Sequence, residues 1–198
     1  MLLRRVTALA AGLAVALAAA PARGATTVAT PDAPTEVSSF AAVSAWSEGR
    51  GDGYRLMVRT GDGEPRELGV GPRGVPFDVD LGPDEDGRVV AVYSRCAREP
   101  RPLEATAPLV AHVTGRGSDL YLADLESGRE RRLEGASSNA ASEVLPSIWR
   151  GEVAFARVYP SREGLAGRVP YLYRRTLGPS ARSRRQAGGV RGASGPVT

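Results

Sequence analysis

Two stretches of the chain repeat each other at a fixed offset, and an internal repeat constrains a fold more strongly than any single motif. Tyr54–Leu68 (YRLMVRTGDGEPREL) and Asp119–Leu133 (DLYLADLESGRERRL) are each 15 residues long and lie 65 positions apart. Each consists of an apolar, strand-like run, a turn that contains glycine, and a charged run that ends on leucine. The repeat predicts that one supersecondary unit is used more than once.

Strand-like runs extend the repeat. Val43–Ser47 precedes the first copy and Val90–Ser94 precedes the second, while a more divergent third unit contains Val153–Arg157 and Tyr171–Leu177. These runs are β-branched, aromatic or alternating, and Gly, Pro, Asp and Ser separate them. Because no window after residue 25 sustains a helical period, we expect each unit to be a small antiparallel sheet.

The sequence therefore predicts three units of four antiparallel strands, at about residues 40–70, 77–135 and 143–187. The strands expected in the first unit are Val37–Phe40, Ala42–Ser47, Tyr54–Thr60 and Pro65–Val70. Those of the second are Phe77–Leu81, Arg88–Ser94, Ser118–Leu125 and Arg129–Gly135. Those of the third are Val144–Trp149, Glu152–Tyr159, Val169–Leu177 and Ala181–Gln186.

Two segments resemble a known family of repeats. Ser118–Leu133 is similar to the third strand, turn and fourth strand of TolB-like β-propeller repeats, and Pro146–Phe155 is similar to their first two strands. The family usually joins those two strands with Ser-Pro-Asp-Gly, whereas this chain has Arg150-Gly151. The resemblance covers about residues 40–187. It implies an all-β, partial β-propeller whose blades pack around an axis and act as a binding scaffold.

Three blades do not close a ring, since propellers have about four to eight. We expect Trp46, Tyr93 and Phe155, or their near neighbours, to fill the space between blades. An open arc would expose an apolar face at each end, and such faces associate. We favour a truncated gene product over a homodimer of six blades.

The N-terminus has the pattern of an export signal. Residues 1–24 combine Arg4 and Arg5, the apolar run Val6–Ala20 and small residues at the cleavage-site positions, as in a cleaved secretory signal peptide. The run is short for a membrane span, so we expect no transmembrane segment in the mature chain, with a retained N-terminal anchor as the alternative. The protein is expected to be secreted or located in the periplasm or cell envelope. Residues 25–39 are expected to form a flexible linker and residues 188–198 a disordered tail.

Positive charge is concentrated at the C-terminal end. All 26 basic residues are Arg; residues 165–198 hold seven of them and no acid, whereas residues 25–164 hold 16 Arg against 22 Asp and Glu. A basic end can bind an anionic envelope polymer or lipid, or it can simply be solvated. We expect no nucleic-acid partner for an exported protein.

The candidate binding residues lie in the longest connection. If the strands alternate in direction, the long connections all emerge on one face of the sheets, and scaffolds commonly display function in such loops. The insertion Arg95–Ser118 is the most distinctive of them. The candidates are Arg95, Arg98, Arg101, His112 and Arg116.

The other group of residues that could bind a ligand or take part in catalysis is an acidic cluster. Its members are Asp78, Asp80, Asp84, Glu85 and Asp86. Carboxylates at this density can hold Ca²⁺, although their spacing does not fit an EF-hand loop. The first two acids can act as a general acid–base pair. The last three are typical of a hairpin turn. One histidine and one cysteine, Cys96, cannot form a His/Cys zinc site. We expect no metal, no cofactor and no catalytic residue.

The sequence therefore favours an exported, non-catalytic propeller module that binds protein or glycan. One alternative is a hydrolase or lyase on a propeller, with His112 and Asp80 in its site. The other is a peripheral binder that holds anionic envelope polymer through the Arg-rich tail.

Overall fold

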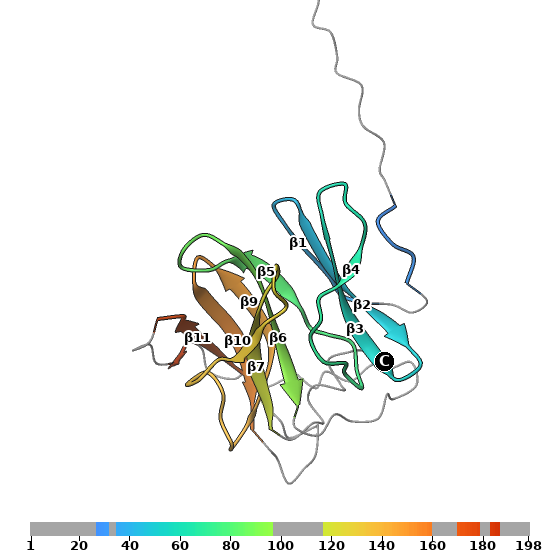
Figure 1. The fold of residues 1–198 in the computed structure, drawn as a ribbon. Helices are drawn as coiled ribbons and strands as arrows, with labels where there is room; N and C mark the ends of the chain where they lie inside the picture. Colours follow the sequence, from blue (N-terminus) through green and yellow to red (C-terminus); the bar gives the residue numbers. More distant parts are fainter. Residues whose placement is uncertain (1–26, 32–34, 97–116, 160–169, 179–182, 187–198) are drawn as a thin grey trace, which may run out of the picture.

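The computed structural model describes residues 27–31, 35–96, 117–159, 170–178 and 183–186. Within these ranges the chain is all-β, with three antiparallel four-stranded sheets and no helix (Figure 1). The prediction of an all-β fold made of three four-stranded units is confirmed. In the described part of the chain, no helix is long and apolar enough to cross a membrane.

Each sheet is formed by four consecutive strands in the order of the sequence. Sheet 1 consists of β1 (Val37–Phe40), β2 (Val43–Arg50), β3 (Gly53–Thr60) and β4 (Arg66–Glu67). Sheet 2 consists of β5 (Asp80–Pro83), β6 (Val89–Cys96), β7 (Ser118–Asp124) and β8 (Glu130–Arg132). Sheet 3 consists of β9 (Ser142–Trp149), β10 (Glu152–Val158), β11 (Pro170–Thr176) and β12 (Arg184–Arg185).

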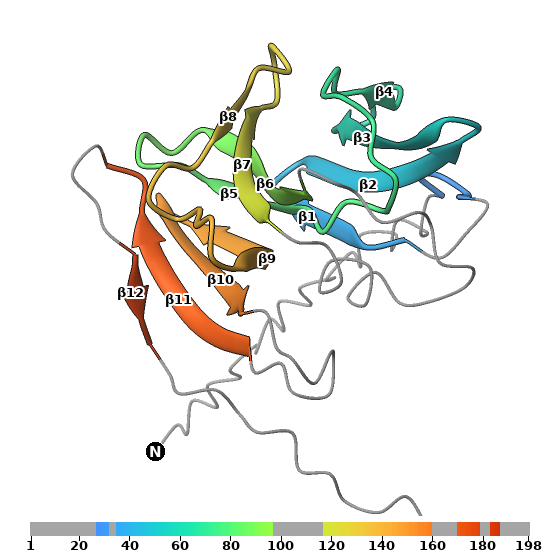
Figure 2. The same ribbon diagram turned by 90° about the horizontal axis from the view of Figure 1, so that it is seen from below.

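Sheet 2 lies between the other two and is covered on both faces (Figure 2). One hydrophobic cluster joins sheets 1 and 2, with Ala45 and Leu56 on one side and Ala91 and Tyr93 on the other. The fully buried Tyr93 ring meets Phe77 edge-on at a centroid distance of 5.2 Å. Successive side chains of a strand point to opposite faces, so β6 contributes its alternate residues to the next interface.

A second hydrophobic cluster joins sheets 2 and 3. Sheet 2 contributes Val90, Val92 and Leu122, and sheet 3 contributes Val153 and Phe155. The strands of sheet 2 therefore carry apolar side chains on both faces, as buried strands do.

The two copies of the repeat form the third and fourth strands of sheets 1 and 2, but the third strands correspond at an offset of 64 residues rather than the 65 of the sequence repeat. Leu68 follows the last strand of sheet 1 and donates its backbone N–H to Leu56 in β3, while Leu133 follows the last strand of sheet 2 and donates to Leu120 in β7. Both leucines are buried, the first in the cluster between sheets 1 and 2, the second in the cluster between sheets 2 and 3. Each copy thus closes its sheet and packs it against the next one.

One of the three predicted inter-blade aromatics is placed differently. Tyr93 and Phe155 lie in the two clusters, but Trp46 belongs to neither. Its neighbour Ala45 faces sheet 2, so Trp46 points to the opposite face of sheet 1, where it is 3% exposed. A shift of one residue along a strand reverses the face that a side chain occupies.

The face of sheet 3 that is turned away from sheet 2 is partly open. Leu172 in β11 lies on this face and is 47% exposed. Leu172 pairs with Ala156 across the sheet. These side chains form an apolar surface rather than a hydrogen-bonded edge.

Candidate binding site

Only one of the five predicted binding residues lies in the described part of the chain. Arg98, Arg101, His112 and Arg116 fall outside the described residues. Arg95 lies near the end of β6, where its guanidinium donates to the Gly71 carbonyl and to the Glu130 carboxylate, both at 3.0 Å.

The Arg95 guanidinium also lies over two aromatic rings. Its distances to the Tyr93 and Tyr121 ring centroids are 5.9 and 5.8 Å. Cation–π contacts of this kind add to the ion pair with Glu130. Arg95 therefore holds the segment between sheets 1 and 2 against the end of sheet 2.

Asp78 is a buried acceptor that joins sheets 2 and 3. Its carboxylate accepts hydrogen bonds from the backbone N–H of Ser94 at 2.8 Å, the Ser94 hydroxyl at 2.7 Å and the backbone N–H of Leu145 at 2.8 Å. The buried Arg73 guanidinium lies 3.4 Å from the same carboxylate. Three donors and a nearby cation stabilise the ionised carboxylate in the interior.

Asp80 reaches all three sheets. One oxygen accepts from the Ser38 hydroxyl in β1 at 2.8 Å, and the other accepts from the Ser147 hydroxyl and the Ile148 N–H in β9, both at 2.9 Å. Both oxygens are therefore occupied, and Asp78 and Asp80 hold strands together.

The remaining acids of the cluster belong to the β5–β6 turn. Asp84 accepts from the backbone N–H groups of Asp86 and Arg88, each at 2.9 Å, and pairs with the Arg88 guanidinium. This arrangement agrees with the hairpin turn expected from the sequence. Among the residues that the structure describes, no group of three or more His, Cys, Asp and Glu is placed to hold a metal ion.

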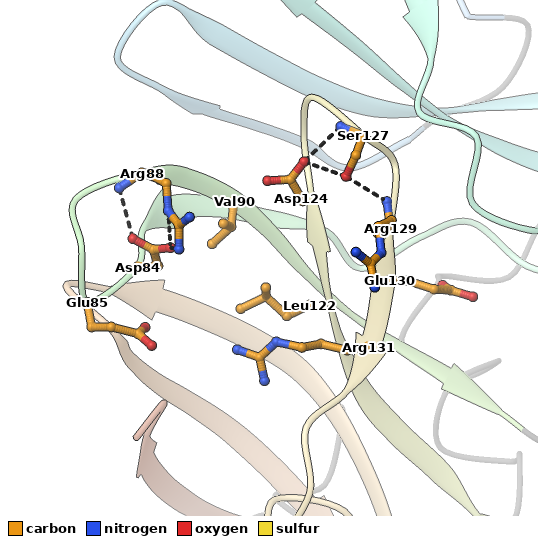
Figure 3. A pocket seen from close by; sticks show the side chains of 10 residues that line it. All are labelled: Asp84, Glu85, Arg88, Val90, Leu122, Asp124, Ser127, Arg129, Glu130 and Arg131. Atoms are coloured by element: carbon orange, nitrogen blue, oxygen red, sulfur yellow. Dashed lines mark hydrogen bonds and ion pairs between the residues drawn. The ribbon is translucent and has the colours of Figure 1, made fainter. Parts of the chain in front are cut away.

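A hollow of about 400 Å³ opens between the β5–β6 and β7–β8 turns (Figure 3). Its volume lies at the lower end of the range of roughly 300–1,000 Å³ that is typical of ligand sites. Its lining residues are Asp84, Glu85, Arg88, Val90, Leu122, Asp124, Ser127, Arg129, Glu130 and Arg131.

The floor of the hollow is apolar. Val90 of β6 and Leu122 of β7 are both buried and belong to the cluster between sheets 2 and 3. In Figure 3 their side chains lie between the two turns. A ligand in the hollow would therefore bury apolar atoms against a preformed surface.

Several of the charged lining groups are already satisfied. Arg88 pairs with Asp84 and Asp86. Asp124 accepts from the hydroxyl and backbone N–H of Ser127, both at 2.7 Å, and these hydrogen bonds hold the pKa of Asp124 below its usual range. These pairs shape the two turns.

Three charged side chains of the hollow have no hydrogen bond or ion pair with the described residues: Glu85, Arg129 and Arg131. A second guanidinium, that of Arg175, lies near Arg131. Burial and the positive charge of Arg131 both lower the pKa of Arg175. Arg129 and Arg131 therefore present positive charge that is paired with no carboxylate of the described residues, which favours an anionic group of a ligand.

The hollow lies on the opposite side of the sheets from the predicted binding face. The long connections follow the second and fourth strand of each unit, whereas the hollow lies between two short turns, which follow β5 and β7. The sequence feature that could have indicated the hollow is the spacing of Arg129 and Arg131. Residues two apart on an extended strand share a face.

A second cluster of polar and aromatic groups lies on sheet 3. The Tyr159 and Tyr173 hydroxyls are 3.2 Å apart, and the Arg157 guanidinium lies 4.3 Å from the Tyr173 ring centroid. Arg157 also donates to the fully buried Glu143 at 2.7 Å. Burial raises the pKa of Glu143 to about 7, despite the opposing effect of Arg157.

The sole cysteine is buried at the junction of β6 and β7. Cys96 pairs in register with Ser118, and its thiol contacts the Ser118 hydroxyl. This position agrees with a packed side chain.

Comparison with known proteins does not assign the chain to a family. No protein-family model matches the chain, and no curated protein matches its sequence.

Proposed function

We propose that the chain is an exported, non-catalytic binding module, built as part of a TolB-like β-propeller, whose ligand is a protein or a glycan. The observation that carries the proposal is the hollow between the β5–β6 and β7–β8 turns. It combines an apolar floor with three charged side chains that have no partner among the described residues. Such a combination is typical of recognition sites.

The arrangement of the sheets supports the propeller part of the proposal. Propeller blades are four-stranded antiparallel sheets that pack face to face, and sheets 1, 2 and 3 have this construction. The equivalent places of Leu68 and Leu133 indicate a true repeat. The open face of sheet 3, with Leu172, is where a further blade would pack.

The environment of the acids supports a non-catalytic role. A general acid or base needs a carboxylate that can reach a substrate. Asp78 and Asp80 instead accept hydrogen bonds that join the sheets. Export is inferred from the signal-like pattern of residues 1–24.

Peptide and glycan arrays probed with the full chain, purified as exported, test this function. We expect binding that is at least tenfold weaker in the double variant Arg129→Gln/Arg131→Gln and unchanged in Arg184→Gln, which alters an exposed arginine of β12. The ligand should be recovered chemically intact after incubation. No binding to either array or to free peptides in solution, equal binding by the double variant, or cleavage of the ligand would each contradict the proposal.

A further inference from the structure

The three unpaired charges of the hollow are separated by sign. Glu85 belongs to the β5–β6 turn, whereas Arg129 and Arg131 belong to the β7–β8 side. Figure 3 shows the Glu85 carboxylate and the Arg131 guanidinium extending from these two sides into the same space. No ion pair joins them, and both side chains line the hollow.

A ligand with charge at only one end fits this arrangement poorly. An anion drawn to Arg129 and Arg131 leaves Glu85 without a partner, and a second anionic group near Glu85 would be repelled. A ligand with a cationic group at one end and a carboxylate at the other satisfies both sides. The apolar floor of Val90 and Leu122 lies between them.

The size and lining favour a short peptide over a sugar. The hollow holds about 400 Å³, and two or three extended residues span roughly 7–10 Å. None of the ten lining residues is aromatic, so a sugar ring would find no aromatic face to stack on. A short peptide carries an ammonium group, an apolar side chain and a carboxylate in the order that the hollow presents partners for them.

We propose that this hollow binds the zwitterionic form of a peptide of two or three residues. The ammonium group pairs with Glu85, the terminal carboxylate pairs with Arg129 and Arg131, and an apolar side chain packs on Val90 and Leu122. This inference rests on the proposed function and names the ligand class of the same site.

Titration calorimetry of the full chain with three dipeptide probes tests the inference. The probes are Ala-Leu, N-acetyl-Ala-Leu, which lacks the ammonium group, and Ala-Leu-amide, which lacks the carboxylate. For a ligand of this size we expect a Kd on the order of 1 mM for Ala-Leu. Each capped peptide should bind about tenfold more weakly, because one charge of the site is then left unpaired.

Substitutions in the hollow identify which side chain binds which end of the dipeptide. Glu85→Gln should weaken Ala-Leu binding about tenfold and leave N-acetyl-Ala-Leu unaffected. Arg131→Gln should weaken Ala-Leu and leave Ala-Leu-amide unaffected. The matched controls are Glu64→Gln, an exposed acid of the β3–β4 turn, and Arg184→Gln, and both should bind all three probes like the parent chain.

Two results would overturn the inference. One is equal affinity for the free and capped peptides; the other is no detectable heat with any dipeptide at 20 mM (about 20-fold above the expected Kd). The proposed function fails separately, if neither the arrays nor free peptides in solution yield a ligand that depends on Arg129 and Arg131. An acidic oligosaccharide that binds through these arginines while the dipeptides do not would retain the function and reject the peptide.

Discussion

The Ser38 hydroxyl donates a 2.8 Å hydrogen bond to the Asp80 carboxylate, which joins the first strand of sheet 1 to the first strand of sheet 2. Ser38 also accepts from the backbone N–H of Leu81 at 2.9 Å. The second Asp80 oxygen binds β9 through Ser147 and Ile148. A single carboxylate thus connects the first strands of all three sheets.

Asp80→Ala should destabilise the chain by about 3 kcal/mol, because it removes charge-assisted hydrogen bonds and leaves donors in two other sheets without their acceptor. Urea unfolding of the two proteins measures this free energy. Glu64→Ala removes an exposed acid of the β3–β4 turn and should change it by less than about 0.5 kcal/mol. Equal effects of the two substitutions would show that Asp80 holds nothing together.

Gly82→Ala should destabilise the interface between sheets 2 and 3. An alanine Cβ at this position would lie 2.3 Å from the Ile148 carbonyl oxygen, and overpacking of this kind costs about 1–3 kcal/mol. Gly51→Ala is the matched control, because a Cβ there meets nothing within 4 Å. Thermal unfolding of both variants gives the comparison, and a Tm for Gly82→Ala equal to that of the control would contradict the close approach of the sheets.

Arg73 and Asp78 should be energetically coupled. Removing one member of a buried ion pair costs about 3–5 kcal/mol, since the other charge stays in the interior. We therefore expect Arg73→Met and Asp78→Ala each to cost at least about 3 kcal/mol, and the double variant to cost less than their sum by about 1–3 kcal/mol. A double-mutant cycle by urea unfolding measures this difference, and strict additivity would exclude the coupling.

The stability of the chain should depend on the ionisation of Glu143. Burial raises its pKa to about 7 in the folded state from 4.5, so the folded chain binds this proton more tightly than the unfolded chain. Stability from this group is therefore full below about pH 4.5, falls as the pH rises to about 7 and is constant above it, with a total loss of at most about 3 kcal/mol.

Glu143→Gln should remove this part of the pH dependence. The charged groups that act on Glu143 are Arg157 of β10, which lowers its pKa, and Asp119 of β7, which raises it. Tm measured from pH 4.5 to 8 in the parent chain and the variant isolates the contribution, because other titrating groups are common to both. Parallel curves would mean that Glu143 keeps an ordinary pKa.

Most of the fold could be predicted from the sequence because its signals are local. Turn residues separate the strand-like runs, and every expected strand has a counterpart in the structure. The face of each strand was harder to predict. Because side chains alternate along β2, only one of Ala45 and Trp46 can face sheet 2. The larger side chain favours the tryptophan, yet it is Ala45 that packs against sheet 2. That choice depends on which sheet lies opposite, and a single strand does not encode it.

The candidate site was less accessible to sequence reasoning. Long loops are the usual prediction for binding segments, whereas the hollow is built from two short turns. These turns are far apart in the sequence: Asp84 of one and Asp124 of the other are separated by 40 residues. Their proximity depends on the pairing of β6 with β7. The roles of Asp78 and Asp80 were hidden for the same reason, because their partners Leu145 and Ile148 are more than 60 residues away.

The rings of Phe40 in β1 and Trp149 in β9 meet edge-on, with centroids 5.7 Å apart. This contact joins the first and third sheets directly, although sheet 2 lies between them in the order of packing. Many repeat arrays contact only nearest neighbours, so that one end can fray independently of the other. Here an end sheet cannot detach without breaking contacts to both of the others, and the described part of the chain should therefore melt in a single cooperative transition.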